Sequence, residues 1–159
     1  MSKARRVKRR SAAPRGKARK PRLLGTWKLV SAIREEIPSG HNTDYFGPNP
    51  AGYLHYSPEG RMIALIVRGD RKRPAGAVAG AGEIEALFKS AVSYTGTYAL
   101  EGDQVIHRVD ASLNEIWTGS QQRRTVRFAG ERLQLSTPQS PDPLDGLLSV
   151  RTMTWERVR

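Results

Sequence analysis

The chain has 159 residues, no cysteine and a formal net charge of +12, most of which lies in its first 22 residues. That segment holds 11 of the 27 Lys and Arg residues and no acid, so residues 23–159 carry 16 basic and 15 acidic side chains. The composition excludes disulfides, thiolate metal sites and a cysteine nucleophile, and it does not predict a basic face on the folded part.

Residues 1–22 are predicted to be a disordered basic N-terminal tail, because they have almost no apolar surface to bury. Residues 23–159 are predicted to form one domain around one core. No apolar run approaches the roughly 20 residues that a membrane-spanning helix needs. No apolar signal region follows the arginine pairs of the tail. We therefore expect a cytoplasmic protein without a transmembrane segment.

The first predicted strand covers residues 27–33, where apolar and polar residues alternate. Two more strands are predicted at 52–56 and 61–67. They are joined by Ser57-Pro58-Glu59-Gly60, whose proline and glycine stand where a type I turn prefers them. This pattern predicts a β-hairpin.

Residues 83–91 give the one helical signal, because apolar residues recur there at i, i+3, i+4 and i+7. Further strands are predicted at 93–100, 104–110, 121–128, 132–136 and 148–158. Regular spacing and short turns favour an all-β fold. We expect a single antiparallel up-and-down β-barrel of about 8–10 strands, with one short inserted helix near 83–91.

Eight short motifs follow one another from Leu23 to Val158. They are LGTWKLVS at 24–31, FGPNPAGYL at 46–54, YSPEGRM at 56–62, YTGTY at 94–98, HRVDASL at 107–113, WTG at 117–119, LQLSTP at 133–138 and TWERV at 154–158. In this order and spacing they resemble the bacterial and fungal lipocalin-like domain family, a branch of the calycin superfamily. The resemblance covers residues 23–158 and leaves out the tail.

The resemblance implies a small barrel with an interior cavity for a hydrophobic small molecule, such as a polyketide-like or other secondary metabolite. It also implies that Trp27 packs across the closed end of the barrel beneath an arginine of the last strand. Arg151 and Arg157 are the candidates for this closure. They share one face of that strand, so periodicity does not choose between them.

His55 and His107 each lie in the middle of a predicted strand. If their faces point inward, the cavity holds two imidazoles among apolar groups, as small-molecule sites often do. The alternative is a hydrogen-bonded core histidine or a surface histidine. Arg124 is expected to alternate inward with Val126. The candidate ligand-binding residues are Tyr53, His55, Tyr94, His107, Asn114, Trp117 and Arg124.

Three functions stay open, and the sequence does not decide whether the protein is an enzyme. The first is binding of a hydrophobic small molecule without a cofactor. The second is a cofactor-free cyclase or isomerase, with His55 or His107 as catalytic residue and Tyr53 or Tyr94 as a donor. The third is association with nucleic acid, or with an anionic surface, through the basic tail.

We expect no metal site, because His41, His55 and His107 lack the spacing of metal ligands. The sequence does not determine the oligomeric state, and a homodimer is one option.

Overall fold

The computed structural model describes residues 22–142 and 145–159, so the predicted disordered tail lies outside the described residues except for Arg22. The elements are β1 (Gly25–Glu36), β2 (Asn42–Asp44), β3 (Ala51–Tyr56), β4 (Arg61–Val67), α2 (Ala81–Lys89), β5 (Ala91–Glu101), β6 (Gln104–Ser112), η1 (Glu115–Trp117), β7 (Gln121–Ala129), β8 (Arg132–Ser136), β9 (Ser140–Pro141) and β10 (Leu148–Arg157). The short η1 is a 3-10 helix.

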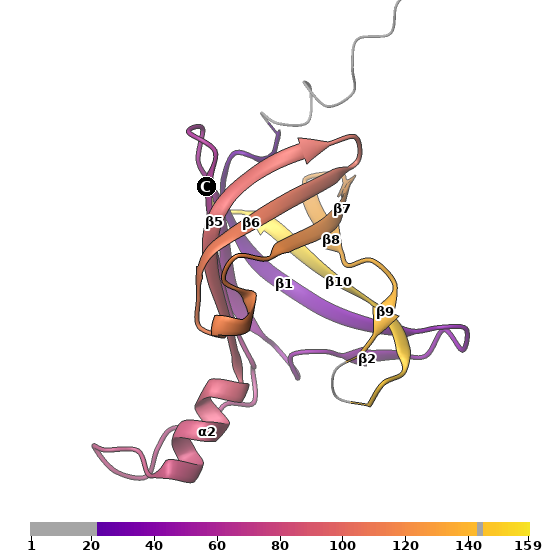
Figure 1. Ribbon diagram of the computed structural model, residues 1–159. Helices are drawn as coiled ribbons and strands as arrows, with labels where there is room; N and C mark the ends of the chain where they lie inside the picture. The colour runs from indigo at the N-terminus through magenta and orange to yellow at the C-terminus, as the bar shows by residue number, and fades with distance from the viewer. Residues whose placement is uncertain (1–21, 143–144) are drawn as a thin grey trace, which may run out of the picture.

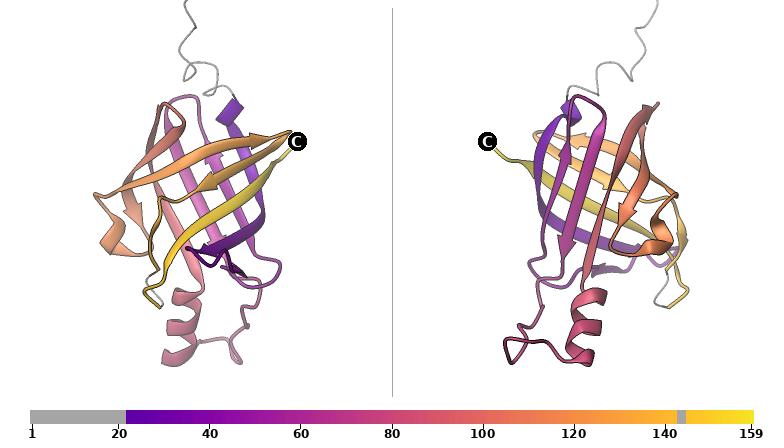
Figure 2. Two further views of the ribbon diagram at one scale, coloured as in Figure 1. Left: turned by 90° about the vertical axis from the view of Figure 1, so that its right-hand side faces the viewer. Right: turned by 60° about the vertical axis from the view of Figure 1, so that its left-hand side comes forward.

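Eight antiparallel strands form a closed barrel in the order β1-β3-β4-β5-β6-β7-β8-β10 (Figures 1 and 2). The ring closes because β10 also pairs with β1, in a register that runs from Trp27 opposite Arg157 to Glu36 opposite Ser149. In the closed ring, the backbone N–H and C=O groups that would be unpaired at a free sheet edge form hydrogen bonds with the neighbouring strand. The short strands β2 and β9 extend β1 and β10 at one end. The all-β, up-and-down barrel is confirmed.

The hairpin between β3 and β4 has the predicted turn at Ser57–Gly60. Gly60 has a φ of +90°, which favours glycine, and its amide donates to the carbonyl of Ser57 at 3.2 Å. The predicted helix is also present, although α2 spans Ala81–Lys89 instead of 83–91.

Helix α2 lies in the connection from β4 to β5 and extends away from the barrel (Figure 1). Within it, Glu83 accepts hydrogen bonds from the amides of Gly80 and Ala75, and Lys89 pairs with Glu85. None of the helices in the described part of the chain is long and apolar enough to cross a membrane.

Two irregularities change which side chains face inward. In β1 the register shifts between Leu29 and Ser31, so the inward positions before the bulge have the opposite parity from those after it. Trp27 and Leu29 are buried before it, and Ala32 and Arg34 after it. In β5 the register shifts at Gly96, where an added Cβ would lie 1.9 Å from the carbonyl oxygen of Arg108. Glycine therefore allows β5 and β6 to approach closely there.

One hydrophobic core fills the barrel. Its inward side chains alternate with outward ones along each strand, as the pleat requires. The largest fully buried members are Trp27, Trp155, Tyr56, Leu23, Leu54, Met62 and Leu133.

One end of the barrel is closed around Trp27. The guanidinium carbon of Arg157 lies 4.2 Å from the centre of the indole ring, and the indole nitrogen donates to the carbonyl of Leu23 at 2.8 Å. Arg157 also donates to the carbonyls of Leu24 and Arg22. Cation–π attraction and these hydrogen bonds hold the first and last strands together over the core. Of the two candidate arginines, Arg157 occupies the position over Trp27.

Candidate ligand-binding cavity

The barrel interior contains a cavity of about 470 Å³. This volume falls in the range of small-molecule sites. Aliphatic and aromatic side chains form most of its wall: Phe46, Leu54, Ala64, Ile66, Val92, Leu135, Met153 and Trp155. Polar side chains also contribute to the wall, among them Tyr94, His107, Gln122, Arg124 and Arg151.

His107 projects from β6 into the core, where its side chain is 1% exposed. Its Nε2 lies 2.7 Å from the hydroxyl oxygen of Tyr56, and its Nδ1 lies 3.0 Å from that of Tyr94. β3 supplies Tyr56 and β5 supplies Tyr94, so the imidazole bridges phenols from opposite directions. The three rings stack at tilted angles, and Trp117 packs edge-on against Tyr94.

The surroundings of the two phenols indicate which ring nitrogen carries the proton. The hydroxyl of Tyr56 is completely buried, and His107 is its one hydrogen-bond partner in the described structure. Tyr94 is also buried, but it lines the cavity, where a ligand can accept its hydrogen. We therefore assign Nε2 as the acceptor from Tyr56 and Nδ1 as the nitrogen that carries the hydrogen, which it donates to Tyr94. The hydroxyl hydrogen of Tyr94 remains available to an acceptor in the cavity.

These three groups are uncharged at neutral pH. Burial lowers the pKa of His107 to about 3, and the positive charge of Arg124 acts in the same direction. Burial raises the pKa of Tyr94, and it raises the pKa of Tyr56 well above its usual value. An imidazole with so low a pKa, engaged at both nitrogens, positions the phenols and is poorly suited to proton transfer near pH 7.

Arg124 enters the cavity wall from β7, opposite Val105 of β6. Its Nη1 donates to the carbonyl of Arg123 at 2.7 Å, and its Nη2 donates to the side-chain oxygen of Gln122 at 3.3 Å. The expectation that Arg124 alternates inward with Val126 holds. Two of its five N–H groups are thereby used.

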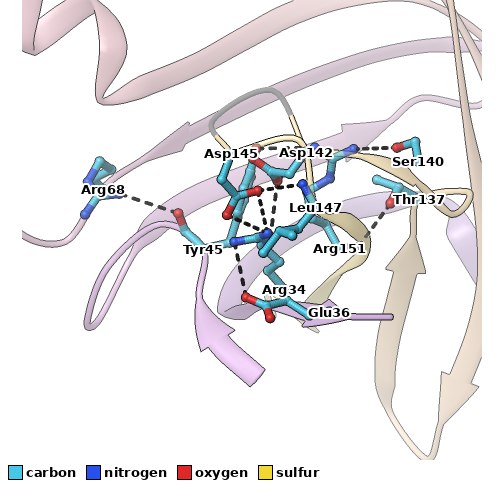
Figure 3. A network of polar contacts seen from close by, with 10 residues as sticks. All are labelled: Arg34, Glu36, Tyr45, Arg68, Thr137, Ser140, Asp142, Asp145, Leu147 and Arg151. Carbon is cyan, nitrogen blue, oxygen red and sulfur yellow. Dashed lines mark hydrogen bonds and ion pairs between the residues drawn. The ribbon is translucent and has the colours of Figure 1, made fainter. Parts of the chain in front are cut away.

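The other end of the barrel is organised by a network of charged side chains (Figure 3). Arg34 of β1 is 8% exposed and donates to Asp145 at 2.8 Å, while its Nε lies 3.5 Å from Asp142. Arg151 of β10 also lies 3.5 Å from Asp142 and donates to Ser140 at 3.2 Å. The two arginines thus hold the segment between β8 and β10 against the barrel.

Electrostatics at this end favour the ionised form of Asp145. The backbone amide of Leu147 and the guanidinium of Arg34 hold the pKa of Asp145 below its usual value. Asp142 is 2% exposed and shared by two arginines. Arg151 lines the cavity, but it faces this carboxylate, so its charge is balanced.

Four of the predicted ligand-binding residues line the cavity: Tyr94, His107, Trp117 and Arg124. Trp117 forms part of this wall. The structure therefore brings together residues from β5, β6, η1 and β7.

The other three predicted positions need correction. The pairing of Trp27 with Leu54 turns Leu54 inward, so Tyr53 and His55 face outward on β3. Tyr53 is 52% exposed, and His55 is hydrogen-bonded to Thr26 at 2.9 Å. The side chain of Asn114 accepts from the amide of Ile116 and caps η1, outside the cavity wall.

Arg151 was expected as a candidate for closure over Trp27, and its position is also corrected. It lies toward the opposite end of β10 from Arg157, near Tyr45, with its guanidinium carbon 5.5 Å from that ring. Sequence reasoning missed Tyr56 and Trp155, which complete the polar interior. Their burial on period-two positions was the available signal.

Trp155 has an indole nitrogen without a hydrogen-bond partner in the described part of the chain. Its side chain is 2% exposed and contributes to the cavity wall. Among residues 22–142 and 145–159, no three His, Asp or Glu side chains gather as metal ligands.

A closed barrel with an interior cavity defines a ligand-binding fold in general. The chain belongs to the family of the lipocalin-like domain, whose model matches residues 24–158. Among solved structures, a lipocalin-like protein from Bacteroides uniformis is similar to it, with a TM-score of 0.46 and 13% identity. That match covers 86% of this chain and 99% of the other. No curated protein sequence matches the chain.

Proposed function

We propose that this protein binds a hydrophobic small molecule inside its barrel. The observation that carries the proposal is the cavity of about 470 Å³, whose wall is mostly apolar and also contains polar groups held by hydrogen bonds. Such a combination is typical of sites that bury most of a ligand and orient it through few hydrogen bonds. The finer expectation, a polyketide-like or other secondary metabolite, rests on the family resemblance.

Binding is favoured over the alternative of a cyclase or isomerase by the state of the two candidate histidines. His55 lies on the outer face of β3, away from the cavity wall. His107 is neutral and hydrogen-bonded at both ring nitrogens. General acid–base catalysis near pH 7 works best with a pKa near 7 and a nitrogen free to reach substrate.

The third function, association with nucleic acid or an anionic surface through residues 1–22, stays a prediction because nearly all of that segment lies outside the described residues. A cytoplasmic location and a homodimer also stay predictions. Deleting residues 1–21 should remove retention on heparin at low salt if the tail binds polyanions. Equal elution of the full-length and truncated proteins would contradict that function.

The proposed binding is tested with N-phenyl-1-naphthylamine, a neutral apolar dye that fluoresces when it leaves water. Ala64 lines the cavity, so Ala64→Phe should fill part of it and reduce dye affinity about tenfold or more. The matched control is Leu65→Phe, because the neighbouring residue is 45% exposed on the outer face of β4. It should bind as the wild type does.

A second variant covers the case in which Ala64→Phe does not fold. Val92→Trp adds bulk to the cavity wall at a partly exposed position, so the core is less disturbed. Native mass spectrometry of protein purified from its own host should also detect a bound small molecule. No dye binding to the wild type, or unchanged binding in both folded cavity variants, would contradict the proposed function.

A further inference from the structure

Among the described residues, one cation of the cavity wall has no carboxylate beside it. Three arginines contribute to its wall: Arg123, Arg124 and Arg151. Arg123 pairs with Glu101 at 3.2 Å, and Arg151 faces Asp142 at 3.5 Å. Within the described part of the chain, no Asp or Glu lies within 4.0 Å of the nitrogens of Arg124, whose hydrogen bonds go to neutral oxygens.

The surroundings of Arg124 do not neutralise its charge. The positive charge acts on Tyr56, Tyr94 and His107, which are all uncharged at neutral pH. These groups lie close enough that the guanidinium lowers the pKa of each of them. Arg124 is partly exposed, whereas the three rings are buried. The interior beside the rings is therefore electropositive, and the low polarity around them strengthens the interaction with an anion that binds there.

A neutral donor in the same cavity independently favours an acceptor on the ligand. The hydroxyl of Tyr94 lies at the cavity wall and is hydrogen-bonded to His107, and in the tautomer assigned above it keeps its own hydrogen free. Buried donors of this kind are normally satisfied, so an oxygen atom of a bound ligand would complete the hydrogen bonding of Tyr94.

We propose that the ligand is an amphipathic organic acid, whose carboxylate pairs with Arg124 and whose apolar body contacts the aliphatic wall. This inference rests on the proposed function, because it names the class of molecule that the cavity takes. A guanidinium is suited to the role, since its planar fork matches the two oxygens of a carboxylate. Gln122 fixes the guanidinium by accepting from Nη2. Tyr94 donates to another oxygen of the ligand.

The test compares two dyes that differ mainly in one charge. The anionic dye is 1-anilinonaphthalene-8-sulfonate, and the neutral one is N-phenyl-1-naphthylamine, which lacks the sulfonate. The sulfonate stands in for the carboxylate. Arg124→Gln should weaken binding of the anionic dye about tenfold or more, as expected for one lost charge-assisted hydrogen bond. Binding of the neutral dye should stay within about twofold.

Matched variants separate this effect from a general change in charge. Arg127 lies on the same strand but faces outward, so Arg127→Gln removes one positive charge outside the cavity. It should leave both affinities unchanged. Arg124→Lys should retain part of the preference for the anionic dye, because the charge remains but the planar fork is lost.

The outcomes distinguish this proposal from the function on which it rests. If Arg124→Gln weakens both dyes equally, or weakens neither, the acidic ligand is contradicted while binding to the wild type still supports the hydrophobic cavity. If neither dye binds the wild type, both proposals fail. If Arg124→Gln does not fold, raising sodium chloride from 0.02 to 0.5 M should weaken the anionic dye alone in the wild type. Equal salt dependence of both dyes would then overturn the inference.

Discussion

The hydroxyl of Tyr56 donates to Nε2 of His107 across 2.7 Å in the centre of the barrel. Both side chains are completely or almost completely buried. The bond joins β3 to β6, which do not pair directly in the sheet. In the tautomer assigned from this bond, Tyr94 presents a donor to the cavity.

Removing this donor should destabilise the protein. Tyr56→Phe leaves the lone pair of His107 Nε2 without a partner, which should lower the free energy of unfolding by about 1–3 kcal/mol. Urea denaturation measures the change. Tyr98→Phe is the control, because the hydroxyl of Tyr98 donates to the carbonyl of Ser57 in a less buried position, and the loss of stability should be smaller.

Nitrogen-15 NMR tests the tautomer and should find the hydrogen of His107 on Nδ1. Finding it on Nε2 would overturn the assignment.

The low pKa of His107 makes stability depend on pH. The unfolded histidine takes up a proton near pH 6.5, whereas the folded one does so near pH 3. The unfolded state therefore binds more protons between these values, and stability is complete above pH 6.5 and decreases as the pH falls toward 3. From pH 7.5 to 5 the free energy of unfolding should drop by about 2 kcal/mol from this residue.

Urea denaturation of two variants checks that pH dependence. His107→Gln removes the titrating group. The free energy of unfolding of this variant should change little between pH 7.5 and 5, even if the substitution lowers stability at pH 7.5. His55→Gln, on the outer face of β3, should keep the slope of the wild type. A slope that survives in His107→Gln would show that another group is responsible.

The contact between Arg157 and Trp27 predicts a stability effect at the closed end. Arg157→Ala removes the stacking on the indole and the hydrogen bonds to two carbonyls, which should cost about 1–2 kcal/mol. Arg159→Ala, at an exposed position, is the control and should change stability little. Dye binding should persist in Arg157→Ala, because Arg157 is not part of the cavity wall. A neutral effect on unfolding would contradict the closing role.

The charge network at the opposite end predicts a larger effect. Arg34→Met removes one of the two arginines that face the buried Asp142, which should cost about 3 kcal/mol or more. Adding Asp142→Asn should recover part of this loss, because the buried charge is then removed. The control is Arg61→Met, whose half-exposed partner Asp110 should make the loss less than about 1 kcal/mol. Equal losses for the two single variants would contradict the network.

The barrel could be predicted from the sequence because its signals are local. The turn at Gly60, the apolar face of residues 83–91 and the Gly-x-Trp beginning of the first strand are each readable over a few residues. The motifs then set the order of the strands. What they do not set is the direction in which each strand faces. β3 has aromatic or apolar residues on both faces, so alternation alone did not show that Tyr53 and His55 point outward.

The polar interior was less predictable because it depends on irregularities and distant contacts. The bulge in β1 turns Arg34 inward, although strict alternation from Trp27 would turn it outward. Its partner Asp142 is more than 100 residues away and arrives there only because β10 closes the ring. The outward direction of His55 follows from the pairing of Trp27 with Leu54. That register is set by contact between β1 and β3, so the local sequence pattern does not contain it.

The ladder between β1 and β10 also means that the barrel has no structural beginning. The amide of Val158 donates to the carbonyl of Thr26, and Arg157 contacts the backbone of Arg22, so a short linker could join residues 22 and 159. A chain opened instead at the exposed turn around Gly102 would be a circular permutant that keeps every strand pairing. The sequence in which the strands are synthesised is thus separable from the sequence in which they lie around the ring.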